Sequence, residues 1–239
     1  MIGLGTIINV ALILVGGLIG LACGRFITPG IQDTLLKAIG LCVIFIGVAG
    51  TLEEMMAVED GALVSGGTAM MIISFTLGSI VGEALDLDAR MEGLGEWLKR
   101  KTGSSGDASF VDGFVTASLT VCVGAMAIVG SIQDGLLGDW STLALKGALD
   151  AIVVCVMTAS MGKGCIFSAL PVAVLQGTVT ALAGLLEPIM TDAALSYLSL
   201  TGNMLIFCVG ANLIWGKLFK PANMLPAIVV AVVYALVMG

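Results

Sequence analysis

The chain has 239 residues, of which 58% are hydrophobic, 11% are charged and 33 are glycines. This composition excludes a water-soluble core, because too little polar surface would remain to cover it. It is typical of an all-α polytopic membrane protein, and continuous apolar runs without period-two alternation exclude a transmembrane barrel. The net charge of −7 does not indicate a nucleic-acid partner, since its meaning depends on which side each charge faces.

Eight apolar segments are long enough to cross a bilayer, which takes about 20 residues of helix. They are residues 3–24, 35–52, 62–84, 110–130, 143–161, 165–186, 198–216 and 221–238. The first lacks a basic stretch and a cleavage site, so we expect a retained helix and not a signal peptide. In the sixth, Pro171 follows Gly162 and Gly164 closely, so the segment either spans the membrane or re-enters it.

Charges between the predicted spans indicate their orientation, because positively charged loops stay in the cytoplasm. Nine of the ten basic residues fall on one side: Arg25, Lys37, Arg90, Lys99, Arg100, Lys101, Lys163, Lys217 and Lys220. The other side holds only Lys146, together with Glu53, Glu54, Glu59, Asp60, Asp134, Asp139, Glu187 and Asp192. We therefore expect both termini outside and the basic loops inside.

Residues 86–109 form the one sizeable segment outside the predicted spans. Leu87, Met91, Leu94, Trp97 and Leu98 recur at helical spacing and are followed by three basic residues. The pattern predicts an amphipathic linker helix on the cytoplasmic headgroups, and a docking site for a partner is the alternative.

An internal repeat links the fourth and seventh spans. The string Cys-Val-Gly-Ala occurs at Cys122–Ala125 and again at Cys208–Ala211, 86 residues later. Weaker matches link the second span to the seventh and the first to the sixth. Because these partners lie an odd number of spans apart, they would run in opposite directions. The sequence thus predicts inverted halves, 1–85 and 162–239, around a central pair at 110–161.

Polar residues at membrane depth are the candidate site residues, because each is costly if it faces lipid. Asp150 comes first, as a transport residue or as the partner of Lys146 one helical turn away. The other candidates for a substrate or ion path are Asn212, Gln133, Asp134, Gln176, Asn9, Asn223 and Lys163. The amides have a structural alternative, hydrogen bonding between helices. Lys163 is included because the helix start after it would favour an anion.

Glycines at four-residue spacing allow helices to approach closely. We expect Gly16, Gly20, Gly24, Gly124 and Gly210 to pack helices together, within the chain or against a second copy. A two-fold homo-oligomer is the expected assembly.

The sequence predicts no cofactor, no metal site and no enzymatic activity. It has no histidine, and its six cysteines lie in apolar runs without a C-x-x-C pair. It also lacks a phosphate-binding G-x-x-x-x-G-K-[ST] motif, which excludes an ATP-driven pump. An intramembrane enzyme would need a nucleophile or paired carboxylates at depth, and only Asp150 qualifies.

Several strings resemble the YqgA-like family of bacterial inner-membrane proteins. They are CVGAMAIVGSIQDGLLGD (122–139), LKGALD (145–150), FSALPVAVLQG (167–177) and GNMLIFCVGANLIWGKLFKPANMLPA (202–227). The family is a domain of unknown function classed as a proposed transporter, so the resemblance implies a multi-pass inner-membrane location and says almost nothing about substrate. Gln133, Asp134, Asp150, Gln176, Asn212 and Asn223 lie within these strings, whereas Asn9 and Lys163 do not.

The function predicted is therefore a secondary transporter or channel for a small ion or solute, embedded in the lipid bilayer of the bacterial inner membrane. The alternative is a membrane scaffold or regulator that packs a partner through its glycine-rich helices. Substrate, coupling ion, direction and the choice between channel and carrier are left open.

Overall fold

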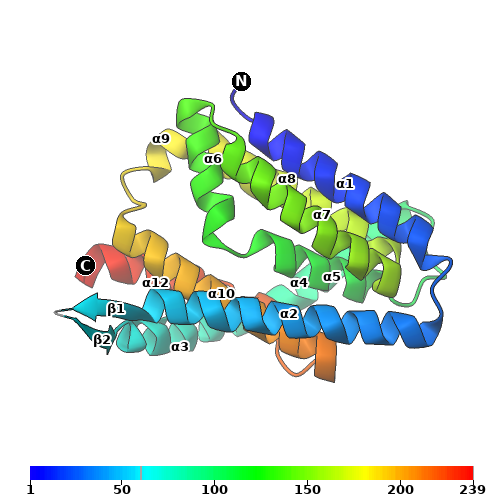
Figure 1. Cartoon of the computed structure of the whole chain (residues 1–239), viewed down its shortest axis with the longest axis horizontal. Coiled ribbons are helices and arrows are strands. Elements are labelled where there is room, and N and C mark those ends of the chain that lie inside the picture. The colour runs from blue at the N-terminus through cyan, green and yellow to red at the C-terminus, as the bar shows by residue number, and fades with distance from the viewer. Residues whose placement is uncertain (60, 239) are drawn as a thin grey trace.

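The computed structural model describes residues 1–59 and 61–238. Helices account for almost all of it, with one small hairpin of two strands (Figure 1). In chain order the elements are α1 (Leu4–Gly24), α2 (Pro29–Met55), β1 (Met56–Glu59), β2 (Ala62–Ser65), α3 (Thr68–Leu85), α4 (Leu87–Lys101), α5 (Phe110–Cys122), α6 (Ala125–Leu137), α7 (Ser141–Met161), the 3-10 helix η1 (Lys163–Ser168), α8 (Ala169–Ala181), α9 (Ala183–Leu186), α10 (Asp192–Trp215), α11 (Pro221–Met224) and α12 (Pro226–Met238).

The predicted all-α polytopic architecture is confirmed. Among the described residues, seven helical segments are long and apolar enough to cross a membrane, and the bent pair α5 and α6 makes an eighth. The sixth segment was expected either to span the membrane or to re-enter it, and η1 and α8 together are long and apolar enough to span, from Lys163 to Ala181. A sharp bend lies between α5 and α6, where the chain turns by 63°.

The helices pack as two groups. The first helix group comprises α1, α5, α6, α7, η1 and α8, in which α1 packs along α7 and α6 against α8. The second helix group comprises α2, α3, α10, α11 and α12, in which α10 packs on α2 and α12 on α3. Figure 1 shows the bend between α5 and α6 lying between the two groups. Each predicted half of the repeat contributes helices to both groups.

Glycines bring α1 and α7 close together. A Cβ added to Gly16 or Gly20 would clash with the carbonyl oxygen of Ala151 or Cys155, respectively. Gly24 lies against Ala159 in the same register, so the two helices run parallel. This close approach places the polar residues of α7 directly against α1.

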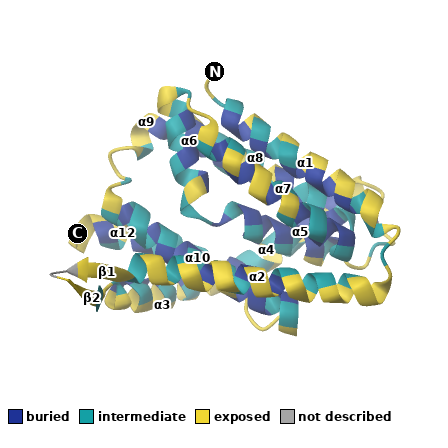
Figure 2. Cartoon of the chain, in the orientation of Figure 1, coloured by how far each residue is buried: buried dark blue, intermediate teal, exposed yellow. Residues whose placement is uncertain are grey.

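The second helix group pairs helices that run in opposite directions. Gly40 of α2 faces Leu213 of α10, whereas Gly47 faces Asn203, so the order is reversed. Gly210 lies against α2, and in α3 Gly78 and Gly82 pack against α12 and α11. Much of the outward surface of α2 is exposed, as expected for a helix that faces lipid (Figure 2).

Two predicted segment boundaries are corrected. The third span was expected to begin at residue 62, but Ala62–Ser65 forms β2, which pairs antiparallel with β1. Gly61, with φ at 79°, supplies the left-handed conformation that tight hairpins use. The fourth span was expected to end at residue 130, but α6 continues to Leu137 and carries Asp134 into the protein interior. Asp60, expected on the acidic side, lies outside the described residues.

The basic loops gather at one end of the molecule, which we call the basic end. Lys217, after α10, forms ion pairs with Glu92 of α4 and Asp112 of α5. Gly162, before η1, lies near Asp107 in the loop before α5. Lys146, counted on the opposite side in the charge tally, is buried inside α7 and is not a loop residue. The asymmetry of the loops is therefore sharper than the sequence tally.

The expected amphipathic helix is present as α4. Its basic residues Lys99, Arg100 and Lys101 fall in the last turn, where the helix dipole favours positive charge. Leu98, expected to face lipid headgroups, is buried against Phe110 and Phe114 of α5. Trp97 remains 47% exposed. One part of the apolar face of α4 therefore packs against α5, and another part is exposed.

We predict that Gly20→Ala destabilises the protein, because the added methyl group would meet the backbone of α7. Overpacking of this kind typically costs about 1–3 kcal/mol. Gly177→Ala in α8 is the matched control, since its Cβ would have no atom within 4 Å. Thermal unfolding in detergent, followed by fluorescence-detected size exclusion, measures both. Equal unfolding temperatures would contradict the close packing of α1 on α7.

Candidate functional site

The break between α5 and α6 is built by two residues. Val123 is extended, with φ at −82° and ψ at 126°, and Gly124 has φ at 143°. Side chains rarely adopt the conformation of Gly124, so glycine is needed there. Gly124 was expected to pack helices, but its Cβ would have no atom within 4 Å. Its copy in the repeat, Gly210, lies inside a continuous helix, so the two copies differ in conformation.

Lys146 of α7 binds the broken end of α5. Its Nζ donates a hydrogen bond of 2.7 Å to the carbonyl oxygen of Val121, and it also forms a short ion pair with Asp150. The side chains of Lys146 and Asp150 are only 8% and 11% exposed. Carbonyl groups at a helix C-terminus carry partial negative charge, so the ammonium stabilises the break. The ion pair considered in the sequence therefore exists, and it lies at the break.

Asn9 of α1 faces this ion pair. It is 0% exposed and approaches Asp150, yet neither its amide nitrogen nor its carbonyl oxygen completes a hydrogen bond. Gly147, between Lys146 and Asp150 on α7, leaves room for Asn9. A Cβ at Gly147 would lie only 2.8 Å from the Cα of Asn9. Gln176 of α8 is similar, 1% exposed with both amide atoms unpaired.

Asp134 is the second buried carboxylate. One of its oxygens, Oδ2, accepts a 3.0 Å hydrogen bond from the backbone N–H of Gly5, at the start of α1. The other oxygen is unpaired, and the residue is 0% exposed. The charge tally placed Asp134 in an outer loop, and that placement is wrong. A carboxylate at a helix N-terminus is favoured by the helix dipole. This contact accounts for one of the two carboxylate oxygens of Asp134.

Buried polar atoms without partners are confined to the first helix group. In the part of the chain that the structure describes, they belong to Thr6 and Asn9 of α1, Ser118 of α5, Asp134 of α6, Thr158 and Ser160 of α7, Ser168 of η1, and Gln176 and Thr180 of α8. We call these residues, with Lys146 and Asp150, the polar file. An unpaired polar atom buried in protein costs about 1–3 kcal/mol. Such a concentration in one helix group calls for a functional explanation.

The polar file extends along most of the membrane thickness. Leu143 of α7 contacts Gly5, so it marks the level of Asp134. From Leu143 to Asp150 is about 10 Å, and from Asp150 to Thr158 about 12 Å, at 1.5 Å of rise per residue. The hydrocarbon core of a bilayer is about 30 Å thick. The ion pair therefore lies near the middle of a column of polar groups.

Four predicted candidates lie outside this column, and three of them have structural contacts. Gln133 accepts a hydrogen bond from Thr142. Asn212 binds the backbone of Leu218 and Phe219 through both amide atoms, and so stabilises the loop after α10. Asn223 joins α11 to Glu83 and to the backbone of Asp88. Lys163 begins η1 at the basic end.

Sequence reasoning missed the hydroxyl residues of the polar file. Serine and threonine are common in membrane helices, where they usually bond to their own backbone. Thr120 and Ser131 do so here. Ser118, Thr158 and Ser168 do not, and nothing in the local sequence separates the two kinds. Only the helix packing identifies them.

A charged pocket opens at the basic end. Its volume is about 470 Å³, and its lining includes Asp88, Glu92, Asp112, Lys217 and Lys220. Thr116 and Leu119 of α5 also line it, and Leu119 is two residues from Val121. The pocket therefore approaches the break from this end.

Lys217 holds the wall of this pocket together. Its hydrogen bond to Glu92, helped by Asp112, raises the pKa of Lys217 from 10.5 to about 12. Because the pKa is higher in the folded state, the stabilisation is present below about 10.5 and is lost as pH rises through about 12. Lys217 therefore stays charged and paired at physiological pH.

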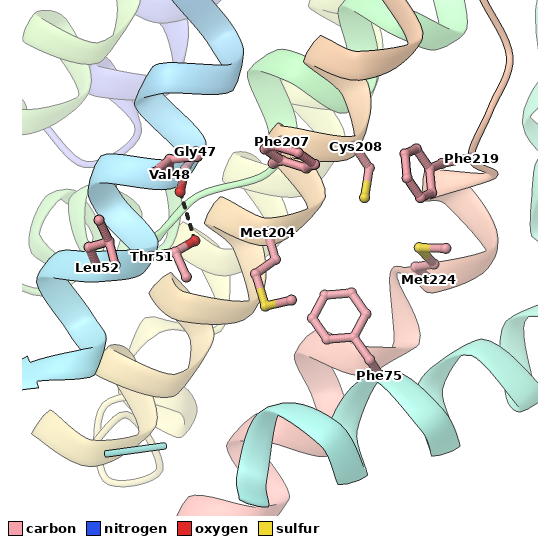
Figure 3. Close-up of a pocket in the computed structure, with 10 residues that line it drawn as sticks. All are labelled: Gly47, Val48, Thr51, Leu52, Phe75, Met204, Phe207, Cys208, Phe219 and Met224. Atoms are coloured by element: carbon pink, nitrogen blue, oxygen red, sulfur yellow. Dashed lines mark hydrogen bonds between the residues drawn. The ribbon is translucent and has the colours of Figure 1, made fainter. Parts of the chain in front are cut away.

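A second cavity, of about 420 Å³, lies in the second helix group between α2, α3, α10 and α11 (Figure 3). Its lining is apolar, with Phe75, Phe207 and Phe219 around it. The hydroxyl of Thr51 turns away to the carbonyl oxygen of Gly47 in its own helix, as the dashed line in Figure 3 shows. The cavity offers no charged group, so it does not suit an ion.

Comparison with known proteins places the chain among membrane proteins that lack an assigned function. A family model described as "Protein of unknown function (DUF554)" matches residues 4–236. The uncharacterized membrane protein YdfK of Bacillus subtilis is 26% identical over 226 residues, covering 95% of this chain and 93% of YdfK. The uncharacterized protein YqgA of Escherichia coli is 25% identical over 235 residues, with 95% and 94% covered. No solved structure matches.

We predict that Lys146→Met strongly destabilises the fold, because it leaves the Asp150 carboxylate buried without its partner. Breaking a buried ion pair costs about 3–5 kcal/mol. The double variant Lys146→Met, Asp150→Asn should recover much of this loss. Lys37→Met, which breaks an exposed pair with Asp33 on α2, is the matched control and should cost at most about 1 kcal/mol. Thermal unfolding in detergent compares the four proteins. A double variant no more stable than Lys146→Met would show that the two charges are not coupled.

We also predict that Lys217→Met loosens α4 while leaving the membrane helices intact, because it removes both ion pairs to α4 and α5. Hydrogen exchange of residues 87–101 in nanodiscs should become faster. Lys101→Met is the control, since Lys101 lies over the Trp97 ring at 6.0 Å and is free of such ion pairs. Unchanged exchange in Lys217→Met would mean that apolar packing alone holds α4.

Proposed function

We propose that this chain, which belongs to the DUF554 family of proteins of unknown function, is a secondary transporter or channel for a small ion or solute. Its place would be the bacterial inner membrane, with both termini outside. The observation that carries the proposal is the Lys146–Asp150 pair, buried in the first helix group at a break in a membrane helix. Charges at that depth are expensive and typically mark a transport path.

Broken helices suit transport for a physical reason. Irregular backbone at membrane depth is tolerated only where it is buried in protein or lines a cavity. At such a break, carbonyl groups of one half-helix and N–H groups of the other can bind a substrate that has left water. Here the carbonyl of Val121 is held by Lys146, and α6 begins at Ala125 without a side-chain cap.

Helix pairing also supports the inverted repeat, which we include in the proposal. The first three spans pack on their predicted counterparts: α1 on α8, α2 on α10, and α3 on α12. The last two pairs are antiparallel, as an axis in the membrane plane requires. Such an axis would let one site open to either side in turn.

The scaffold alternative loses its main support. It relied on glycine-rich faces that would pack a partner, but Gly16 and Gly20 are occupied by α7 of the same chain, and Gly82 by α11. A homodimer formed through other lipid-facing surfaces remains part of the proposal, as does the absence of enzymatic activity. The polar file holds a lysine and two carboxylates, which suits passage of a solute better than covalent catalysis.

We expect substrate jumps to drive currents through the reconstituted protein. Solid-supported-membrane electrophysiology would step protons, metal cations, anions, small carboxylates and amino acids in turn. Asp150→Asn should abolish the current, because it removes the charge that balances Lys146 in the path. Asp139→Asn, the same change in an exposed loop, is the matched control and should leave the current unchanged.

Silence across the whole panel from folded, inserted protein would leave only electroneutral exchange. Uptake of labelled substrates from the same panel tests that case. If uptake were also absent, the transport proposal would be rejected in favour of the scaffold.

A further inference from the structure

We propose that the polar file is a proton relay, and that the transport proposed above consists of or is driven by proton movement. The inference rests on the proposed transport function and names the ion that the path carries. Its charged members are the Lys146–Asp150 pair and Asp134, and its other members are hydroxyl and amide groups with unpaired atoms.

The unpaired atoms are the first argument. Nearly all buried polar groups in proteins have a hydrogen-bond partner, from protein or from water. Asn9 and Gln176 each leave both a donor and an acceptor unpaired, and Ser118 and Thr158 each leave a hydroxyl unpaired. Water molecules that bridge such groups would satisfy them. Hydroxyl groups and water both donate and accept hydrogen bonds, which proton transfer requires, and the amides of Asn9 and Gln176 can hold such water in place.

The charges in the file are the second argument. A metal cation moving along it would meet the ammonium of Lys146, which binds both Asp150 and the Val121 carbonyl. An anion would meet the carboxylates of Asp134 and Asp150, both buried. Among the described residues, no three histidine, cysteine or carboxylate groups come together as a metal site would need. A proton avoids these barriers, because it can move by exchange on the charged groups themselves.

The step at the ion pair balances in protons and charge. An N–H bond of the Lys146 ammonium breaks and an O–H bond forms on Asp150, leaving a neutral amine and a neutral acid. Asp150 then releases its proton to water towards Ser118, and the amine of Lys146 takes a proton from water towards Asp134. The ion pair is restored, and one proton has moved along the file.

The surroundings of Asp150 leave this exchange to few groups. In the described structure, the titratable groups that face it are Lys146 on its own helix and Cys122 on α5. Asn9 faces it from α1 with an uncharged amide. Ile13 and Val154, both 0% exposed, pack together beyond Asp150 towards the basic end. They fill this side of the ion pair with apolar side chains, so the file is not an open pore.

The test measures proton flux into liposomes that contain the full chain. Pyranine inside the vesicles reports internal pH after an external acid step, with potassium and valinomycin holding the voltage near zero. The lumen of liposomes that contain wild-type protein should acidify faster than that of empty liposomes. This acidification should be slower in heavy water than in ordinary water. The proton flux of Asp150→Asn should fall to the leak of empty liposomes, because the asparagine amide cannot take up and release the proton as the carboxylate does. Asp150→Glu should restore flux, and Asp139→Asn should match wild type.

Gln176→Met separates a relay from a structural role. It removes an unpaired buried amide in a side chain of similar shape, so unfolding temperature should stay equal or rise. Proton flux should nevertheless fall. A stable Gln176→Met with wild-type flux would overturn the assignment of the file as the path, and so would Asp150→Asn protein that folds and conducts normally.

The outcome can also distinguish this inference from the function on which it rests. An Asp150-dependent current for a metal cation or an organic solute, with no proton flux in wild type, would reject the relay and keep the transporter. Absence of every flux would reject both.

Discussion

The interaction on which the structure depends is the double contact of the Lys146 ammonium with Asp150 and with the carbonyl of Val121. A broken membrane helix exposes carbonyl groups that water cannot reach, and a lone lysine or aspartate at that depth would be costly. Lys146 satisfies the exposed carbonyl of Val121, and Asp150 balances the charge of Lys146. Close packing of α1 on α7 is a condition for it, since Gly147 and the glycines of α1 bring Asn9 against the pair.

The two helix groups divide the work of the fold. In the second group the buried polar residues Ser74, Thr201 and Asn223 have hydrogen-bond partners, an apolar pocket opens between the helices, and much of α2 is exposed. The first group accepts the cost of unpaired polar atoms on all its main helices. Folded proteins are stable by only about 5–15 kcal/mol, so several such atoms are a large expense. This cost therefore falls on the first group and not on the second.

The basic end joins the groups electrostatically. Lys217, in the loop that follows α10, pairs with Glu92 of α4 and Asp112 of α5, while Lys220 pairs with Glu83 of α3. These contacts are partly exposed, so they contribute little to overall stability. They matter for position, because they form the wall of the pocket that approaches the break from this end.

The sequence by itself determined the class and the approximate spans, and it left the pairing of Lys146 with Asp150 as one of two alternatives, because hydropathy and helical spacing are local properties. It also directed attention to Gly124 through the repeated Cys-Val-Gly-Ala string, but assigned it to packing. Only the tertiary structure decided that Gly124 breaks a helix, that Asp134 is buried, and that Asn212 merely stabilises a loop. It alone gathered Asn9, Gln176 and the hydroxyl residues into one column. The physical reason is that these facts depend on which helix faces lie together, and residues far apart in the chain set those contacts.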